Sequence, residues 1–154
     1  MGELGLGRGY RLALDTAIVS EIAAASTSIG GGGANDYEAV LYTMEAVAAA
    51  GYSPDLIVLS PGDALAIRLL VMSSGDSYAF SQSLPDFVVT TAVADTEGFV
   101  MDSSAAGTLF LGSFTFAVFE ENAGSTNSST VRAESSGACV VQRADAIASL
   151  DGSS

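Results

Sequence analysis

The sequence lacks histidine and lysine entirely, so its cationic side chains are five arginines, set against eighteen aspartates and glutamates. Without histidine, the chain cannot build a Ser-His or Cys-His nucleophile pair or an imidazole metal ligand. Without lysine, it cannot form a Schiff base, a Ser-Lys dyad or the phosphate-binding lysine of a P-loop. These two absences exclude most familiar enzyme chemistries.

Cysteine is nearly absent as well, since Cys139 stands alone within the apolar run Ala138-Cys139-Val140-Val141. A single cysteine cannot form an intrachain disulfide, and Arg143 is the only nearby cation in the sequence. We therefore interpret Cys139 as a small buried apolar side chain.

Long apolar runs and basic clusters are also missing. Polar residues interrupt every run well before the ~18 residues that a membrane span requires, so no span is predicted. The start Met1-Gly2-Glu3-Leu4-Gly5 lacks a secretory pattern, and we expect a cytoplasmic origin. A net charge of −13 also disfavours nucleic acid and anionic lipid as partners.

What is present is enough apolar material, 49% of 154 residues, for one domain with a sizeable core. The first half predicts helices over 10–25, 36–50 and 61–73, with a buried strand Leu56–Leu59 between the last two. Asn35 and Ser60 are predicted caps, with Glu38 completing a capping box after Asn35. Leu65, Leu69 and Met72 are expected to face the core. The stripe of the second helix is expected at Tyr37, Val40/Leu41, Met44 and Val47/Ala48.

Two glycine-rich stretches flank the first helix. Gly5, Gly7 and Gly9 follow no strand and have the wrong spacing for a dinucleotide turn, so residues 1–9 are interpreted as a flexible amino-terminal segment. Gly30, Gly31, Gly32 and Gly33 lack a following Gly-Lys-Ser/Thr, so a hinge is favoured over a phosphate cradle.

The second half predicts strands. After a surface loop at 75–85, we expect strands at 87–93, 99–101, 108–111, 114–119, 130–134 and 138–143, and a short apolar end at 145–150. Glu120 and Glu121 are read as a solvated strand end. The predicted class is α+β (mixed α/β), a central mixed sheet flanked by helices.

The order of these pieces resembles the carboxy-terminal part of a tailed-bacteriophage major capsid protein of the Hong Kong 97-like fold. The matching pieces are the helix 36–50, GYSPDLIVLSPGDALAIRLL (51–70), SSGDSYAF (73–80), FVVTTAV (87–93), TLFLGSFTFAVF (108–119) and VRAESSGACVVQRADAI (131–147). The family's amino-terminal arm, E-loop and most of its spine helix have no counterpart here. Ser136 and Ala144 also replace an arginine and a proline that are common in the family.

The resemblance implies an axial (A) domain over 30–125 and a peripheral (P) domain made of 1–29, the end of the spine helix, and 126–154. It implies a subunit that packs into pentamers and hexamers of an icosahedral shell, with itself and other virion proteins as partners and no cofactor. The expected axial contact loop contains Gly75, Asp76, Ser77, Tyr78, Phe80, Gln82 and Leu84, and Gly30–Gly33 would be the hinge between domains. The resemblance implies a location in the virion, with the chain made in the host bacterial cytoplasm.

Two alternatives stay open. An α/β enzyme or ligand-binding module would gather Asp55, Ser60 and Asp63 at the carboxyl end of strand 56–59. Ser60 and Asp63 are, however, also explained as a helix cap. Asp95, Glu97 and Asp102 are likewise explained as acidic residues of loops. An encapsulin-like compartment shell would share the capsid fold and differ in its cargo.

Overall fold

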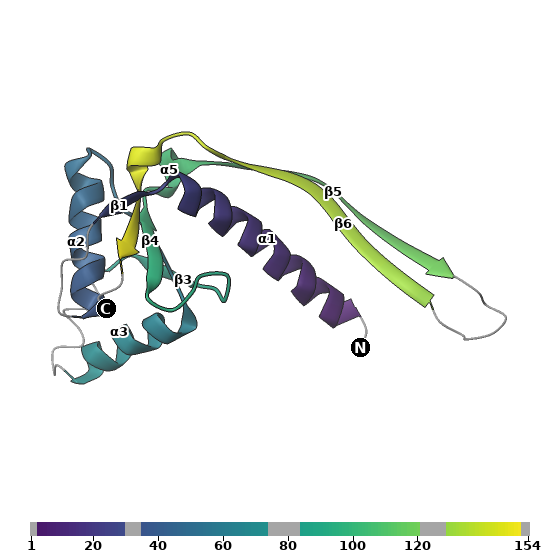
Figure 1. The fold of residues 1–154 in the computed structure, drawn as a ribbon, viewed down its shortest axis with the longest axis horizontal. Helices are drawn as coiled ribbons and strands as arrows, with labels where there is room; N and C mark the ends of the chain where they lie inside the picture. The colour runs from purple at the N-terminus through teal and green to yellow at the C-terminus, as the bar shows by residue number, and fades with distance from the viewer. Residues whose placement is uncertain (1–2, 30–34, 74–83, 121–128, 152–154) are drawn as a thin grey trace.

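The computed structural model describes residues 3–29, 35–73, 84–120 and 129–151, which form a mixed sheet with helices and a long projecting hairpin (Figure 1). The helices are α1 (Glu3–Ala25), α2 (Asp36–Ala49), α3 (Pro61–Ser73) and the short α5 (Ser103–Ala106), with a 3-10 turn η1 (Ala144–Ala146). The strands are β1 (Thr27–Ile29), β2 (Leu56–Leu59), β3 (Asp86–Val89), β4 (Glu97–Met101), β5 (Gly107–Glu120), β6 (Ser129–Val141) and β7 (Ile147–Asp151). The predicted α+β class is confirmed.

The central sheet has the strand order β1-β7-β4-β2-β3. β2 is parallel to β3 and antiparallel to β4, while β7 is antiparallel to β4 and parallel to the edge strand β1. Because successive side chains of a strand point to opposite faces, Ile57 and Leu59 enter one core cluster and Val58 enters another. The predicted strand 56–59 is therefore confirmed as a strand buried on both faces.

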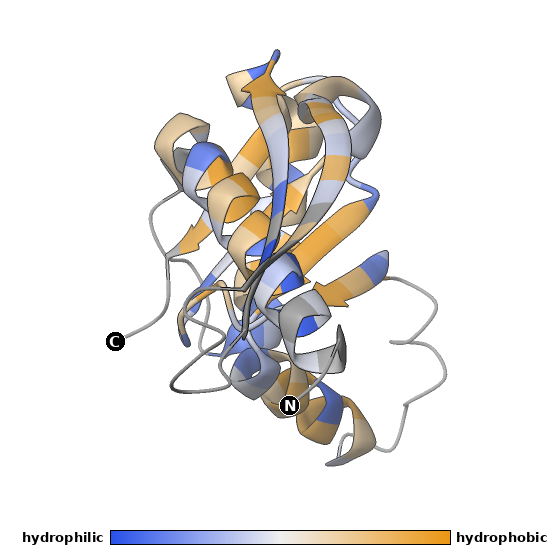
Figure 2. Cartoon of the chain, turned by 90° about the vertical axis from the view of Figure 1, so that its right-hand side faces the viewer, coloured by the Kyte–Doolittle hydropathy of each residue, from blue (hydrophilic) through white to orange (hydrophobic). Residues whose placement is uncertain are grey.

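Helices cover both faces of this sheet, which Figure 2 shows as largely hydrophobic. On one face, α2 and α3 contribute Tyr37, Val40, Val47, Ala64 and Ile67 to the α2-side cluster. On the other face, Val19 and Ile22 of α1 pack against the α1-side cluster, which contains Val58, Phe99, Met101 and Ile147. None of the helices among the described residues is long and apolar enough to cross a membrane.

The two predicted helix caps are confirmed. The Glu38 N–H donates to Asn35 Oδ1 at 3.0 Å, and the Asp63 N–H donates to Ser60 Oγ at 3.1 Å. In α2, however, Thr43 is buried where Leu41 was expected, and its hydroxyl donates to the Ala39 carbonyl at 2.7 Å, so its burial leaves no polar atom unpaired.

The predicted orientation of α3 is wrong. Leu65 and Leu69 are each 56% exposed and Met72 is 73% exposed, whereas Ala64 and Ile67 are buried. The physical reason is that α3 carries apolar residues on two opposite faces, and the sheet accepts the face with the smaller Ala64.

The amino-terminal segment is also corrected, because α1 begins at Glu3 and includes Gly5, Gly7 and Gly9. Each glycine disfavours a helix by about 1 kcal/mol relative to alanine. The Tyr10 ring packs edge-to-face on Phe114 of the hairpin, with centroids 5.1 Å apart, and this contact supports the helix near its start.

The strand bounds of the second half differ from the prediction in three ways. β3 ends at Val89 instead of 93, where a turn begins. The strands predicted at 108–111 and 114–119 form one strand, β5, because residues 112–113 make a bulge and not a turn. The strands at 130–134 and 138–143 likewise form the single strand β6.

Two strands of the central sheet were not predicted. The short apolar end at 145–150 contains β7, which lies between β4 and β1 and buries Ile147, Ala148 and Leu150. The segment after the first helix contains the edge strand β1.

Candidate functional site

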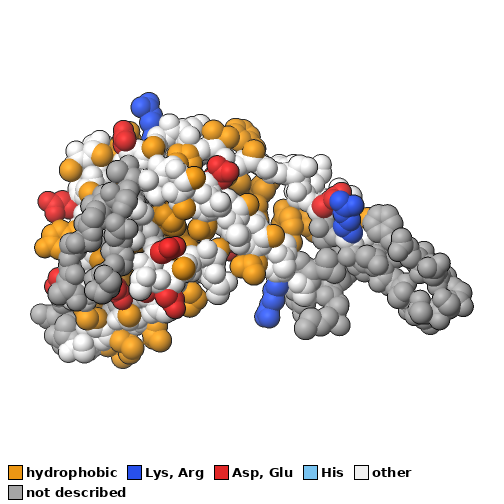
Figure 3. Space-filling model, viewed as in Figure 1, with side chains coloured by type: hydrophobic (Ala, Val, Ile, Leu, Met, Phe, Trp, Pro, Cys, Tyr) orange, Lys and Arg blue, Asp and Glu red, His pale blue; other side chains and the backbone are white. Residues whose placement is uncertain are grey.

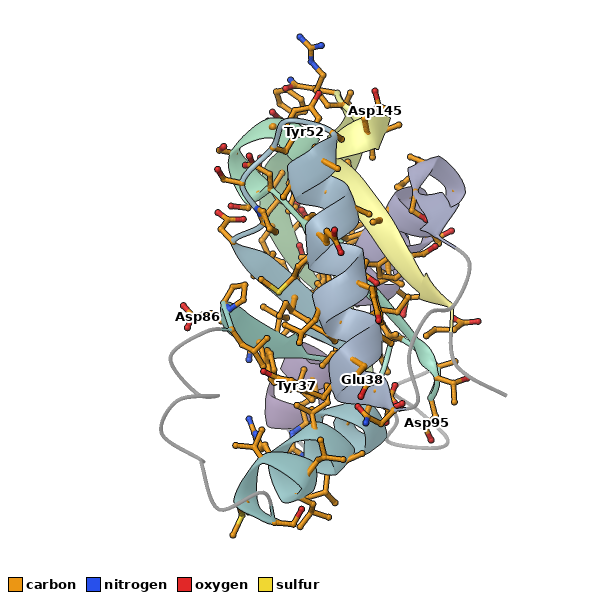
Figure 4. All side chains as sticks on the ribbon, turned by 90° about the vertical axis from the view of Figure 1, so that its left-hand side faces the viewer. Tyr37, Glu38, Tyr52, Asp86, Asp95 and Asp145 are labelled. Carbon is orange, nitrogen blue, oxygen red and sulfur yellow. The ribbon has the colours of Figure 1, made fainter. Side chains whose placement is uncertain are left out.

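The carboxyl end of β2 carries a cluster of polar side chains, which is where an α/β enzyme would place its site. Ser60 Oγ lies 2.7 Å from Asp95 Oδ1 and 2.9 Å from Asp63 Oδ2. The Thr96 N–H donates to the Asp63 carboxylate, at 3.0 Å to Oδ2 and 3.2 Å to Oδ1. Figure 4 shows Asp95 near the same end of α2 as Glu38.

These hydrogen bonds cap the start of α3 and hold it to the turn that contains Asp95 and Thr96. A serine hydroxyl carries one proton, so Ser60 donates to one carboxylate at a time while it accepts from the Asp63 N–H. Asp95 approaches α3 so closely that a Cβ on Gly62 would lie 2.8 Å from Asp95 Oδ1. The cluster therefore ties the first turn of α3 to the loop before β4.

The free space beside this cluster is small. A hollow of about 20 Å³ lies between Asp36, Asp63, Thr96, Glu97 and apolar neighbours, which is the room of about one water molecule. Burial, followed by the negative charge of Asp63, raises the pKa of Asp36 above its ordinary value of 3.8. Among the described residues, this hollow has room for about one solvent molecule.

Asp55 does not join this cluster, so the predicted gathering of Asp55, Ser60 and Asp63 is wrong. Asp55 precedes β2 and accepts hydrogen bonds from the Ser103 N–H and hydroxyl at 2.7 and 2.6 Å. Ser60 and Asp63 follow β2, so the length of the strand separates the two groups.

Asp102 is the N-cap of α5 and immediately precedes Ser103, which donates to Asp55. It accepts from the Ser104 hydroxyl and N–H at 2.6 and 3.0 Å and from the Ser53 N–H at 3.0 Å. The Ser104 hydroxyl and the Ser53 N–H stabilise the carboxylate and lower the pKa of Asp102 below 3.8. Within the described ranges, no group of three or more acidic or cysteine side chains is arranged to hold a metal ion.

The residues predicted for the axial loop and the hinge lie mostly outside the described residues. Gly30–Gly33, Gly75, Asp76, Ser77, Tyr78, Phe80 and Gln82 belong to this set. Leu84 is described, and it is half-buried against the α2-side cluster.

The largest feature that the sequence reasoning missed is an apolar surface on α3, here called the α3 outer face: Leu65, Arg68, Leu69 and Met72. These positions are spaced i, i+3, i+4 and i+7, so they share one side of the helix. Figure 3 shows hydrophobic side chains along the lower left edge of the molecule, where Figure 1 places α3. The signal in the sequence was the absence of any charge on α3 except Asp63 and Arg68.

A second apolar surface lies between α1 and the hairpin. A groove of about 790 Å³ runs between them, with Tyr10, Leu14 and Ile18 on one wall and Leu109 and Leu111 on the other. Leu109 and Leu111 are still 40% and 53% exposed, so the helix does not close over the hairpin. Cys139 lines this groove half-buried, and burial, together with Glu21, raises the pKa of its thiol.

Comparisons with known proteins show which known fold the chain resembles. No family model matches the sequence, and no curated protein does. Among solved structures, the protein of a virus-like particle from Pyrococcus furiosus superposes with a TM-score of 0.68 over 90% of this chain, at 10% sequence identity. The match spans 60% of that protein's length. The chain therefore has a capsid-like fold.

Proposed function

We propose that this chain is a structural subunit of an icosahedral shell, which works by packing many copies together and has no catalytic role. The observation that carries the proposal is the capsid-like fold, shared over nine-tenths of the chain with a virus-like particle protein. The exposed apolar surfaces on α3 and the hairpin support it, because monomeric proteins seldom leave several large apolar side chains exposed side by side.

The domain division that we propose places the central sheet with α2 and α3 in the A domain, and α1 with the hairpin in the P domain. β5 pairs with β6 along nearly its whole length, from Gly107↔Val141 to Glu120↔Ser129. A boundary at 125/126 would assign the two strands of one hairpin to different domains. We therefore assign β5 to the P domain together with β6, and β1 and β7 to the A domain.

Within this proposal, Gly75–Leu84 is the loop that meets neighbouring subunits around the capsomer axis, and Gly30–Gly33 is the hinge between domains. Alanine at all four hinge positions should impair any rearrangement of the assembled shell, because alanine restricts the backbone where glycine does not. Shells that rearrange normally with this variant would refute the hinge.

The finer proposal is a major capsid protein of a tailed phage or prophage, which forms pentamers and hexamers. The acidity of the chain supports it, since a lining with a net charge of −13 would hold packaged DNA weakly and let it slide. An encapsulin-like compartment is the second candidate, because a virus-like particle fold suits a protein container equally well.

The test is to isolate sedimenting particles from cells that make the protein and to identify their main component by peptide mass spectrometry. We expect uniform hollow particles with this chain as the major component. Nuclease-protected DNA inside them indicates a phage capsid, and a protein cargo indicates a compartment. Peptides found only in the non-sedimenting fraction would refute the shell function.

The rival function, an enzyme or ligand-binding module at the end of β2, has its own test. Divalent ions and nucleotides should leave the melting temperature unchanged, because the Ser60, Asp63 and Asp95 oxygens are engaged in holding α3. A rise of several degrees with any of them would indicate binding to the folded state and favour the rival.

A further inference from the structure

The outer side of α3 is unusual because the helix is apolar on two opposite faces. Its inner face, with Ala64 and Ile67, is buried against the sheet, yet Leu65, Leu69 and Met72 on the other face are more than half exposed. A helix that is hydrophobic all round is normally buried all round. Figure 2 shows α3 in hydrophobic colours along most of its length.

The area of this face suits a protein contact. From their exposed fractions, the three apolar side chains offer roughly 300 Å² together, comparable with the largest apolar patch on a typical monomer. This is less than half of the ~800 Å² that one partner buries in a standard interface. The face therefore fits one part of a larger subunit contact.

The charges indicate which surface would cover it. Arg68 is exposed within the α3 outer face and is one of only five cations in the chain. α2 contains acidic residues and no basic residue, and its outer side presents Leu41 at 37% and Tyr42 at 52% exposure beside the exposed Glu45. We call Leu41, Tyr42 and Glu45 the α2 outer face.

We propose that the α3 outer face of one copy docks on the α2 outer face of a second copy of this chain. Pairing two α3 outer faces would bring two Arg68 side chains into one contact, and pairing two α2 outer faces would bring two Glu45 side chains into one contact. The unlike pairing joins apolar surfaces and opposite charges. Figure 4 shows α3 below α2, so the two faces lie on different helices of the same copy.

The contact is heterologous, and repeated head-to-tail contacts close into a ring when the rotation between copies allows it. This inference rests on the proposed shell function and names the surfaces that would join subunits within a capsomer. It places the contact on two helices, separate from the proposed axial loop Gly75–Leu84.

The first test compares Leu69→Glu with the control Leu12→Glu, which adds the same charge at an exposed leucine of α1, 47% exposed. The self-association constant is measured by light scattering and sedimentation over a range of concentrations. Burying a leucine side chain is worth about tenfold or more in affinity, so Leu69→Glu should weaken association at least tenfold and Leu12→Glu less than threefold. Equal effects of the two variants, or a wild-type chain that stays monomeric at every concentration, would overturn the docking surface.

The second test addresses the pairing of faces. Arg68→Glu and Glu45→Arg should each weaken association a few-fold, and the double variant should recover most of the loss because it restores opposite charges. A double variant weaker than both single variants would overturn the unlike pairing. Circular dichroism and urea midpoints check that each variant is folded.

The docking surface and the shell function can be refuted independently of each other. Particles built from this chain together with an intact association of Leu69→Glu would remove the docking surface and leave the shell function standing. Self-association that depends on Leu69, without any particles in the cells, would leave the docking surface standing and remove the shell function.

Discussion

Ile67→Ala is expected to destabilise the chain strongly, while Leu69→Ala, two positions along the same helix, is expected to have little effect. Ile67 is 1% exposed and lies in the α2-side cluster, whereas Leu69 is 56% exposed. Truncating a buried isoleucine to alanine costs about 2–5 kcal/mol, because the transfer energy is lost and a cavity remains. An exposed leucine loses about 0.5 kcal/mol or less.

The measurement is urea and thermal unfolding followed by circular dichroism, at a concentration low enough that self-association does not add to stability. At this chain length, 1 kcal/mol corresponds to roughly 2–4 °C in melting temperature, so Ile67→Ala should melt about 4–20 °C lower. Leu65→Ala is the matched control and should behave like Leu69→Ala. A Leu69→Ala variant as unstable as Ile67→Ala would show that the outer and inner faces of α3 are assigned the wrong way round.

Four further substitutions test local features. Gly98→Ala should cost about 1–3 kcal/mol of unfolding free energy, since its Cβ would lie 2.9 Å from the Val58 carbonyl oxygen; a neutral result in urea would contradict the close packing of β4 on β2. Thr96→Asn should stabilise by about 0.5–1 kcal/mol, because asparagine tolerates the positive φ of 70° better than a β-branched residue; a lower urea midpoint would contradict this. Asp102 has a lowered pKa, so its charge stabilises the fold above its ordinary pKa of 3.8 and the contribution is lost as the pH falls through the lowered value. Urea midpoints of Asp102→Asn should therefore depend less on pH in the acidic range than those of the wild type. The pKa of Asp36 is raised, so its ionisation destabilises the fold as the pH rises. Urea midpoints of Asp36→Asn should therefore rise more steeply with pH in this range than those of the wild type.

The features that could be predicted from the sequence are local ones. The caps Asn35 and Ser60 each bind a backbone N–H three residues ahead, so the evidence for them lies within one helical turn of sequence. The strand Leu56–Leu59 could also be predicted, because four consecutive apolar residues between a proline and a helix start indicate a strand buried on both faces.

The features that were missed depend on distant partners. β7 lies inside the sheet because Ile147 and its neighbours pair with β4, some 46 residues earlier, and with β1. Gly112 and Ser113 read as a turn because glycine and serine favour turns. In the folded chain the long partner strand β6 runs past them, and the ladder absorbs the extra residue as a bulge.

The candidate surface on α3 could not be identified for a related reason. Leu65, Leu69 and Met72 form as good an apolar stripe as the inner residues, and hydrophobic periodicity does not tell burial on folding from burial on assembly. Only the folded core decides, because Ala64 and Ile67 are buried in the α2-side cluster while Leu65 and Leu69 are left exposed. Besides the low charge of α3, Arg68 in the middle of the outer stripe was a local sign, since an arginine is costly inside a core but common at the contact between two subunits. An apolar helix interrupted by one arginine therefore deserves to be considered for two faces, one that folds the subunit and one that joins it to the next.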